Sequence, residues 1–283
     1  MSENVFHKFE TAWCPGCGNF NILDCLVKAL DELDLQPSDV LMVGGIGQAA
    51  KLPQYVNANA FCGLHGRALP AAVAAKIANE RLTVIVNTGD GDSYGEGGNH
   101  FIHNIRRNVD IAHFVHDNQV YGLTKGQASP TSIEGMETDV QVHGNINIPF
   151  NPVLIAIAAG AGFVARAFTG RNEHLVSIMK QAINYNGYAL VDILQPCVSF
   201  NKLNTYAWYD QRVYELDDSY DKTNKISALE KSMEFGEKIP VGILYQEEKP
   251  SFHQKNSVLK SGVPLLDRAT DMNIVQKYLK DFV

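Results

Sequence analysis

The chain has 283 residues, of which 45% are hydrophobic and 19% are charged, and its formal net charge is -7. This composition is typical of a globular protein and excludes large-scale disorder, and the acidic balance argues against a nucleic-acid-binding surface. The longest uncharged apolar stretch, residues 153–165, is shorter than the roughly 20 residues of a membrane helix, and residues 1–10 show no secretory signal, so we expect a cytoplasmic protein without a membrane span.

Short apolar runs alternate with helical stretches along most of the chain. The pattern predicts helices at 19–33, 67–79, 97–107, 152–161 and 173–185, and strands at 39–43, 82–86, 111–115, 163–168 and 189–194. Buried strands separated by helices of about ten residues are typical of a parallel sheet with crossover helices. We therefore predict an α/β fold with one doubly wound, mostly parallel sheet.

The character of the sequence changes after Pro196. Residues 198–216 mix aromatic and polar side chains without a clean period, and we expect this segment to wrap the domain or to meet another subunit. Residues 236–246 predict one further strand, and residues 272–283 predict a terminal amphipathic helix. We divide the chain into a domain at 1–215 and a C-terminal extension at 216–283 that packs on the domain or on a partner.

An aspartate and an asparagine follow neighbouring predicted strands. Gly89, Asp90 and Gly91 come after the strand at 82–86, and Asn118 comes after the strand at 111–115, 28 residues beyond Asp90. The carboxyl ends of parallel strands share one edge of the sheet, where ligands bind, so one crossover step brings Asp90 and Asn118 together. The glycines let the backbone turn sharply and approach a ligand closely.

This pattern predicts a magnesium and phosphate site. Mg²⁺ prefers oxygen ligands, usually one or two carboxylates together with phosphate oxygens of the bound molecule. Asp90, the Asn118 side chain and the carbonyl of Val120 would supply the protein ligands, and a diphosphate would supply others. A Gly-Asp-Gly sequence alone also occurs in ordinary surface turns, but the asparagine at a one-crossover spacing favours metal binding.

These residues belong to a longer series of motifs. In chain order they are WCPGCGNFNIL, GGIGQAAKLP, LHGRALP, GDGD, RRNVDI, YGLTKGQASPTS and QPCVSFNKLNTYAWY, which lie between about residues 12 and 215. The series resembles the beta subunits of the 2-oxoacid:ferredoxin oxidoreductases, which depend on thiamine diphosphate. The resemblance implies a sheet of the thiamine-diphosphate-binding type with a C-terminal extension, and it implies Mg²⁺ held by Asp90, Asn118 and Val120.

The resemblance also assigns residues that contact thiamine diphosphate. They are Gly91, Asp92, Gly122 and Leu123 for the diphosphate, and Ile46, Gly47, Gln48 and Ala49 for the other parts of the cofactor. His65 of LHGR would lie close to the diphosphate, although from the sequence alone a structural histidine remains an alternative. Lys51 and Lys125 are the cations that we place near a substrate carboxylate, with a solvated surface lysine as the alternative for each.

Five cysteines in a chain of this kind indicate metal binding, redox chemistry or burial more than a disulfide framework. Cys14 and Cys17 could form a thioredoxin-type pair, but they precede a predicted helix and follow no strand. Zinc would need two more ligands at matching spacing, and c-type haem would need a histidine in place of Gly18.

In the family that the chain resembles, the Cys-x-x-Cys pair holds an iron–sulfur cluster, and the resemblance implies [4Fe–4S] here. Cys197 matches a further ligand. Many members carry a fourth cysteine directly after Gly-Ile-Gly, where this chain has Gln48. Cys62 is a candidate replacement, with burial as a small apolar residue as the alternative. We expect Cys25 to pack in the core.

The implied activity is the coenzyme A-dependent oxidative decarboxylation of a 2-oxo acid to acyl-CoA and CO2, with electrons passing through the cluster to ferredoxin. An alpha subunit would complete the site in a hetero-oligomer, an alpha–beta unit or its dimer, by supplying a carboxylate for the aminopyrimidine of the cofactor. Glu96 is a local candidate for that role. The alternatives are a non-redox thiamine-diphosphate-dependent decarboxylase or transferase subunit and a binding module without catalysis. The sequence does not specify the 2-oxo acid.

Overall fold

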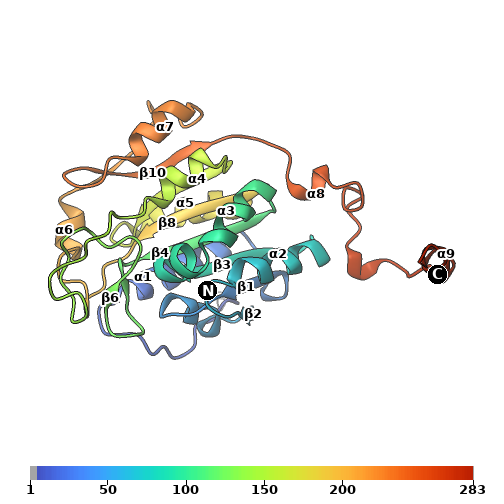
Figure 1. Ribbon diagram of the computed structural model, residues 1–283, viewed down its shortest axis with the longest axis horizontal. Coiled ribbons are helices and arrows are strands. Elements are labelled where there is room, and N and C mark those ends of the chain that lie inside the picture. The colour runs from blue at the N-terminus through green and yellow to red at the C-terminus, as the bar shows by residue number, and fades with distance from the viewer. Residues whose placement is uncertain (1–4, 283) are drawn as a thin grey trace.

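The computed structural model describes residues 5–282 and contains a central eight-stranded sheet (Figure 1). In spatial order the strands are β2 (Asn59–Cys62), β1 (Val40–Gly44), β3 (Thr83–Gly89), β4 (Ile111–Asp117), β8 (Tyr188–Leu194), β7 (Phe163–Phe168), β10 (Ile239–Gln246) and β9 (Val213–Glu215). The strands from β2 to β7 are parallel, β10 runs antiparallel to β7, and β9 runs parallel to β10. The predicted mostly parallel α/β sheet is confirmed.

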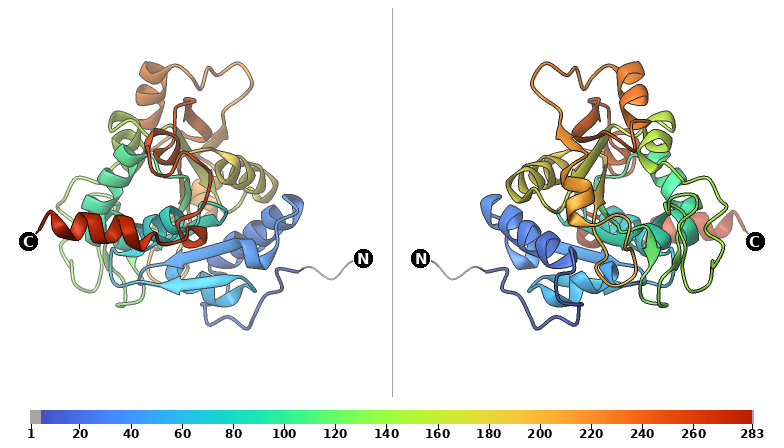
Figure 2. Two further views of the ribbon diagram at one scale, coloured as in Figure 1. Left: turned by 90° about the vertical axis from the view of Figure 1, so that its right-hand side faces the viewer. Right: turned by 90° about the vertical axis from the view of Figure 1, so that its left-hand side faces the viewer.

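Helices cover both faces of the sheet (Figure 2). One face packs against α1 (Asn19–Glu32) and α5 (Asn172–Asn184), and the other against α2 (Ala68–Ala78), α3 (Gly98–Arg107), α4 (Pro152–Ala158) and α7 (Lys225–Ser232). Successive side chains of a strand point to opposite faces, so Phe114 of β4 joins the core under α1 and α5, whereas Val115 joins the core under α2 and α3. This arrangement is the predicted doubly wound fold.

The strand before the glycine and aspartate residues is longer than the sequence pattern predicted. β3 continues through Asn87 and Thr88 to Gly89, although the apolar run ends at Val86. These polar side chains are buried, and the Thr88 hydroxyl bonds to Ser93 and to His113 of the adjacent strand. Asp90 then leads directly into a single π-helical segment, Gly91–Glu96, which the sequence analysis did not anticipate.

Short elements surround the carboxyl edge of the sheet. They are the 3-10 helix η2 (Ala49–Tyr55) and the small hairpin of β5 (Val120–Tyr121) and β6 (Gln127–Ala128), whereas the 3-10 helix Pro37–Asp39 lies at the amino end of β1. Two residues separate the hairpin from β4, and four residues separate η2 from β1. Both therefore hold loops at the end of the sheet where the predicted ligands emerge.

The C-terminal part of the chain begins as an extension of the sheet. α6 (Tyr206–Asp210) and β9 form a small core in which Tyr209 packs with Phe168 and Val241. The predicted strand at 236–246 is confirmed as β10, which pairs with β7.

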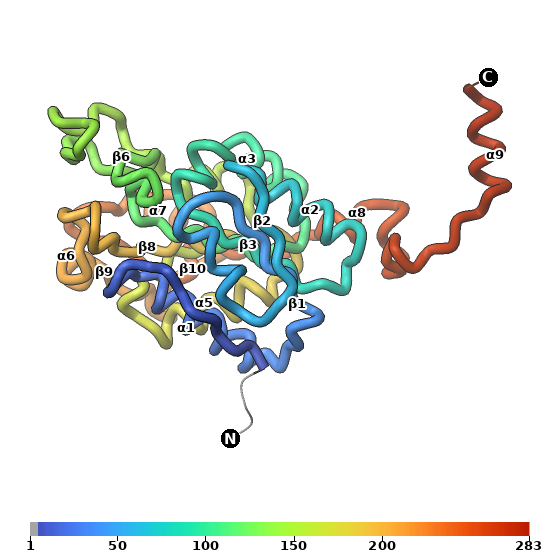
Figure 3. The backbone as a smooth tube through the Cα atoms, turned by 90° about the horizontal axis from the view of Figure 1, so that it is seen from below, coloured from blue at the N-terminus to red at the C-terminus, as the bar shows by residue number. Residues whose placement is uncertain are grey.

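Beyond β10 the chain first packs on the body of the protein, where Phe252 lies against the core under α2 and α3 and His253 is buried, and only the terminal helix extends away from it. The chain continues through α8 (Phe252–Lys255) and the 3-10 turn Leu265–Asp267 to α9 (Met272–Lys280), whose residues are all exposed (Figures 1 and 3). The predicted terminal helix is therefore confirmed, and the division of the chain at residue 215 stays a prediction. None of the helices within residues 5–282 has both the length and the apolar character needed to cross a membrane.

Candidate active site

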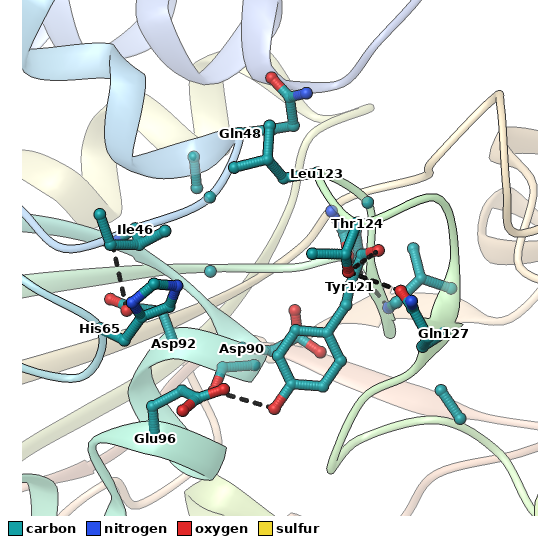
Figure 4. Close-up of a pocket in the computed structure, with 18 residues that line it drawn as sticks. Ile46, Gln48, His65, Asp90, Asp92, Glu96, Tyr121, Leu123, Thr124 and Gln127 are labelled. Atoms are coloured by element: carbon teal, nitrogen blue, oxygen red, sulfur yellow. Dashed lines mark hydrogen bonds between the residues drawn. The ribbon is translucent and has the colours of Figure 1, made fainter.

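A cavity of about 430 Å³ lies at the carboxyl ends of β1, β3 and β4 (Figure 4). Its walls come from the loop after β1, the segment after β3, the segment from Asn118 to Ala128, and His65. We call it the cofactor cavity. The lining includes every residue predicted to hold Mg²⁺ or thiamine diphosphate: Ile46, Gly47, Gln48, Ala49, His65, Asp90, Gly91, Asp92, Asn118, Val120, Gly122 and Leu123. The structure thus brings together residues from four separate segments, with Asp90 and Asn118 as their spacing predicted and the others as the resemblance implied.

Asp90 is held in place by two hydroxyl groups. Its side chain is 1% exposed, and its Oδ2 accepts hydrogen bonds from Thr131, at 2.7 Å, and from Ser129. Burial raises the pKa of the Asp90 carboxyl, and these hydrogen bonds oppose the shift in part. A nearby divalent cation would favour the charged carboxylate, so this group has the chemistry of a metal ligand.

Asp92 connects two loops of the cavity wall. Its Oδ1 accepts hydrogen bonds from the backbone amides of Ile46, at 3.1 Å, and Gly66, at 2.8 Å. The first of these bonds is visible in Figure 4. Gly45 leaves room for the carboxylate, because a Cβ atom there would lie 2.0 Å from Asp92 Oδ2. Asp92 therefore positions the loop after β1 and the loop that carries His65 relative to β3.

Asn118 is placed by the end of β4. Its Oδ1 accepts a hydrogen bond from the Val120 amide at 3.1 Å, and its carbonyl accepts one from Asn201 at 3.2 Å. Gly89 pairs with His116 in the parallel ladder of β3 and β4, so Asp90 and Asn118 leave the sheet at neighbouring points. The carboxylate, the carboxamide and the backbone carbonyl of Val120 form the all-oxygen donor set that Mg²⁺ prefers.

The glycines of the cavity have different roles. A side chain at Gly91 would collide with the Tyr121 ring, because a Cβ atom there would lie 2.3 Å from Tyr121 Cε1. Gly47 has a φ of +125°, which other residues rarely adopt, and Gly122 faces open space. The backbone of both loops can therefore approach a bound molecule closely.

Buried charges lie beneath the cavity. The Tyr94 hydroxyl donates to Asp192 at 2.8 Å, and burial raises the pKa of Asp192 to about 6, with the positive charge of Arg166 opposing the shift. Burial and neighbouring carboxylates raise the pKa of Asp117 well above its usual range. Thr131 Oγ1 lies 2.7 Å from Asp117 Oδ1 and 2.7 Å from Asp90 Oδ2, and the hydroxyl has a single proton to donate. When Asp117 is protonated it can donate to Thr131, and the Thr131 hydroxyl can then donate to Asp90.

His65 and the two predicted cations, Lys51 and Lys125, have different surroundings. His65 is exposed and lines the cavity. Lys51 is half-buried in η2 and Lys125 is exposed with a φ of +84°, and neither is among the residues that line the cavity in the described part of the chain. Glu96 is exposed and does line the cavity.

Three of the cysteines lie near one another beside the cavity. Residues 13–18 form a turn in which the Cys17 amide donates to the Cys14 carbonyl at 3.0 Å, and the Gln195 side chain donates to Cys17 Sγ at 3.4 Å. We call residues 13–18 and 195–198 the cysteine loops. Burial raises the pKa of the Cys17 thiol to about 11, and Cys197 and Cys14 add to the shift. Within residues 5–282, no three His, Cys, Asp or Glu side chains are already arranged around a single ion.

The other two cysteines lie elsewhere. Cys62 ends the edge strand β2, is exposed, and accepts a hydrogen bond from Gln54 at 3.4 Å. It is therefore not buried as a small apolar residue. Cys25 is buried in α1, as expected.

Two family models match consecutive parts of the chain. Residues 43–193 match the family model described as the C-terminal TPP-binding domain of thiamine pyrophosphate enzymes, and residues 197–261 match that of the C-terminal part of the pyruvate ferredoxin oxidoreductase beta subunit. The beta subunit of 2-oxoacid:ferredoxin oxidoreductase from Saccharolobus solfataricus is 46% identical over 262 residues, which cover 88% of this chain and 86% of that protein. The chain belongs to the family of 2-oxoacid:ferredoxin oxidoreductase beta subunits.

Other members of this family agree with the assignment. The corresponding beta subunit from Sulfolobus sp is 42% identical over 280 residues, which cover 94% of this chain and 91% of that protein. A solved 2-oxoglutarate:ferredoxin oxidoreductase from Magnetococcus marinus, with 2-oxoglutarate, coenzyme A and succinyl-CoA bound, superposes with a TM-score of 0.90 at 33% identity, and the match covers 96% of this chain and 94% of that chain. The family assignment confirms an oxidoreductase subunit and supports it over the non-redox alternative.

Residues to which the sequence assigned no role also contribute to this beta-subunit site. Ser129 and Thr131 of the QASPTS stretch orient Asp90, and Tyr121 lies across Gly91 and donates to its carbonyl at 3.4 Å (Figure 4). Their position in the family motif was the only signal available. The sequence does not show that the segment after β5 folds back over the end of β3.

Proposed function

We propose that this beta subunit catalyses, together with an alpha subunit, the coenzyme A-dependent oxidative decarboxylation of a 2-oxo acid to acyl-CoA and CO2, with the electrons passed to ferredoxin. The observation that supports it is that the proposed Mg²⁺ ligands and the proposed cluster ligands adjoin the same wall of one cavity. Asp90, Asn118 and Val120 line the cofactor cavity, and the cysteine loops contact the same wall because Trp13 Nε1 donates to the Gln48 carbonyl at 2.8 Å.

Asp90, Asn118 and the Val120 carbonyl are the proposed ligands of Mg²⁺, with Gly91, Asp92, Gly122 and Leu123 around the diphosphate. The two hydroxyl bonds to Asp90 both reach Oδ2, and the backbone amides of Asp90 and Gly91 also interact with this carboxylate. Thiamine diphosphate supplies the carbon nucleophile and the electron sink for the loss of CO2. The chain's own contribution is to bind and orient the cofactor and to hold Asp90 and Asn118 in fixed positions.

Cys14, Cys17 and Cys197 are the proposed thiolate ligands of a [4Fe–4S] cluster that accepts the electrons. A cluster separates its ligating sulfur atoms more widely than a single ion does, which agrees with thiols that lie near one another without surrounding one point. Ligation would require Cys17 to lose the proton that burial retains.

Binding of the 2-oxo acid carboxylate is proposed for Lys51 and Lys125, and His65 is proposed to lie close to the diphosphate. His65 already lines the cavity, whereas the two lysines would have to approach it when substrate or the alpha subunit binds. The alpha subunit is the proposed source of the carboxylate that contacts the aminopyrimidine, and Glu96 is the local alternative. We further propose a cytoplasmic location and no nucleic-acid partner, in keeping with the net charge of -7.

The decisive experiment uses the anaerobically purified complex of both subunits with ferredoxin and coenzyme A. Reduction of ferredoxin is measured with pyruvate, 2-oxoglutarate and branched-chain 2-oxo acids. We expect reduction with at least one of them, dependent on coenzyme A, thiamine diphosphate and Mg²⁺. Decarboxylation without ferredoxin reduction, in protein without iron and sulfide, would instead indicate the non-redox enzyme. A complex that binds no thiamine diphosphate in the presence of Mg²⁺ would indicate a binding module.

A further inference from the structure

The three cysteines assigned to the cluster come from two loops that pack together. Gly16, with a φ of +80°, lies against Val198, since a Cβ atom there would be 3.7 Å from Val198 Cγ1. Gly18 is closer still to the second loop, because its Cβ position lies 2.6 Å from Gln195 Cγ. Cys14 and Cys17 therefore face the segment that carries Cys197.

Gln48 adjoins the first of the two cysteine loops. Trp13, adjacent to Cys14, donates its indole N–H to the Gln48 carbonyl, so the backbone of Gln48 lies against the first cysteine loop. The Gln48 Oε1 atom is buried and has no hydrogen-bond partner within residues 5–282. In Figure 4 the Gln48 amide points away from the other labelled cavity residues. Gln48 thus carries a buried, unpaired carboxamide oxygen, and its backbone carbonyl binds the first cysteine loop.

The surroundings of Cys62 do not place it in this group. The Cys62 thiol accepts its hydrogen bond from Gln54, in the exposed part of η2, and the backbone of Cys62 pairs with Gly44 at the outer edge of the sheet. The thiols whose charges act on Cys17 are those of Cys197 and Cys14. Of Cys62 and Gln48, the residue that a hydrogen bond joins to the cysteine loops is Gln48.

We propose that the cluster of this chain has three thiolate ligands, from Cys14, Cys17 and Cys197, and that its fourth iron faces the Gln48 carboxamide and is exchangeable. The proposal rests on the proposed function, which supplies the cluster. A neutral amide oxygen binds iron much more weakly than a thiolate does, so this corner of the cluster is held least firmly. A one-electron oxidant takes one electron from [4Fe–4S]²⁺, and the resulting [4Fe–4S]³⁺ separates into [3Fe–4S]⁺ and Fe²⁺.

The test uses the anaerobic complex titrated with ferricyanide, while EPR follows [3Fe–4S]⁺ and a ferrous chelator counts released iron. We expect the wild type to release a single Fe²⁺ per cluster and to develop the [3Fe–4S]⁺ signal. Gln48→Cys adds the missing thiolate and should suppress both changes at least tenfold. Cys62→Ser is the matched control and should behave as the wild type does.

The outcomes separate this inference from the function on which it rests. If the wild-type cluster resists ferricyanide and Cys62→Ser makes it lose iron, Cys62 is the fourth ligand and the inference is wrong. If Gln48→Cys and the wild type release iron equally, the fourth iron does not face residue 48. If no variant binds iron although Mg²⁺ and thiamine diphosphate still bind, the cluster itself is absent and the proposed redox function fails with it.

Discussion

The cofactor cavity and the cysteine loops adjoin one another, yet their side chains are held in different ways. In the cavity, Asp90 is fixed by Ser129 and Thr131, and Asp92 by two backbone amides. In the cysteine loops, Cys14 is exposed and Cys17 and Cys197 are partly exposed, with one hydrogen bond from Gln195 on the Cys17 sulfur. The first site is organised before a ligand binds, and the second depends more on its ligand.

The difference follows from where the residues lie in the fold. Asp90 and Asn118 come directly after β3 and β4, which are paired with Gly89 opposite His116. Cys14 and Cys17 lie in the segment before α1, and Cys197 lies in the segment after β8. A metal held by preorganised side chains binds more weakly when one of their supporting hydrogen bonds is removed. Where the metal itself brings thiol ligands together, its affinity depends more on whether the thiols have lost their protons.

The largest expected effect is at Asp90. Asp90→Asn keeps the size of the side chain and an oxygen for the hydroxyl groups of Ser129 and Thr131, but it removes the negative charge. We expect thiamine diphosphate affinity in the presence of Mg²⁺ to fall by more than about 100-fold, because a direct ligand should matter more than its supporting partners do. Calorimetric titration measures the loss.

The same variant should not be less stable than the wild type in the absence of metal, because burial already disfavours the charged form of Asp90. Thermal unfolding provides this control. Unchanged cofactor affinity in a folded variant would show that the carboxylate does not bind the ion.

The buried charges beneath the cavity should make stability depend on pH. The pKa of Asp192 is about 6 in the folded protein, above its ordinary value, so the folded state binds more protons than the unfolded state between about pH 4 and pH 6. Stability from this group is therefore lost as the pH rises through that window. Asp192→Asn retains an acceptor for Tyr94 and should flatten the decline.

Urea unfolding at several pH values between about 4.5 and 7 gives the free energy of unfolding of the wild type and of Asp192→Asn, and the slopes of that free energy against pH are compared. The slope is informative even if loss of the negative charge beside Arg166 lowers the stability of the variant at every pH. Parallel slopes for wild type and variant would mean that Asp192 titrates at its usual pKa. The surroundings of Asp192 would then be less desolvated than the structure indicates.

The sequence predicted the sheet and the cavity for the same reason. The short apolar runs at 82–86 and 111–115 are typical of buried parallel strands, and Asp90 and Asn118 follow these strands. β2, β9 and α7 were missed because Asn59–Cys62 is an exposed edge strand, Val213–Glu215 has only three residues, and the apolar positions of Lys225–Ser232 are few.

Long-range hydrogen bonds could not be predicted from local pattern. Nothing in the spacing of Ser129 or Thr131 shows that these hydroxyl groups return to Asp90, because the intervening hairpin has strands of only two residues. The role of Asp92 was also hidden, since its partners Ile46 and Gly66 lie on two other loops. The sequence identified the residues of the cavity, but only the structure shows which hydrogen bonds hold them in place.

Thr131 tests whether the cavity is preorganised as proposed. Thr131→Val removes the hydroxyl that bridges Asp90 and Asp117 with little change in shape. We expect Mg²⁺-dependent cofactor affinity to fall between about 10- and 100-fold, the usual range for a partner that orients a metal ligand. Thr131→Ser restores the hydroxyl and should recover most of the affinity. Equal affinity in the valine variant would mean that Ser129 alone positions Asp90.

The smallest effect is expected in the cysteine loops of the chain prepared without iron. Because burial raises the pKa of the Cys17 thiol to about 11, little thiolate is present at pH 8, and alkylation by iodoacetamide should be at least about tenfold slower at Cys17 than at the exposed Cys14. Mass spectrometry of digests taken over time follows each site, with exposed Cys14 as the internal reference and buried Cys25, whose pKa burial raises to about 12, as the slow control. Raising the pH should reduce the difference. Equal rates at Cys14 and Cys17 would show that the first cysteine loop is open without its cluster, which would make the contrast with the rigid cavity greater than the structure indicates.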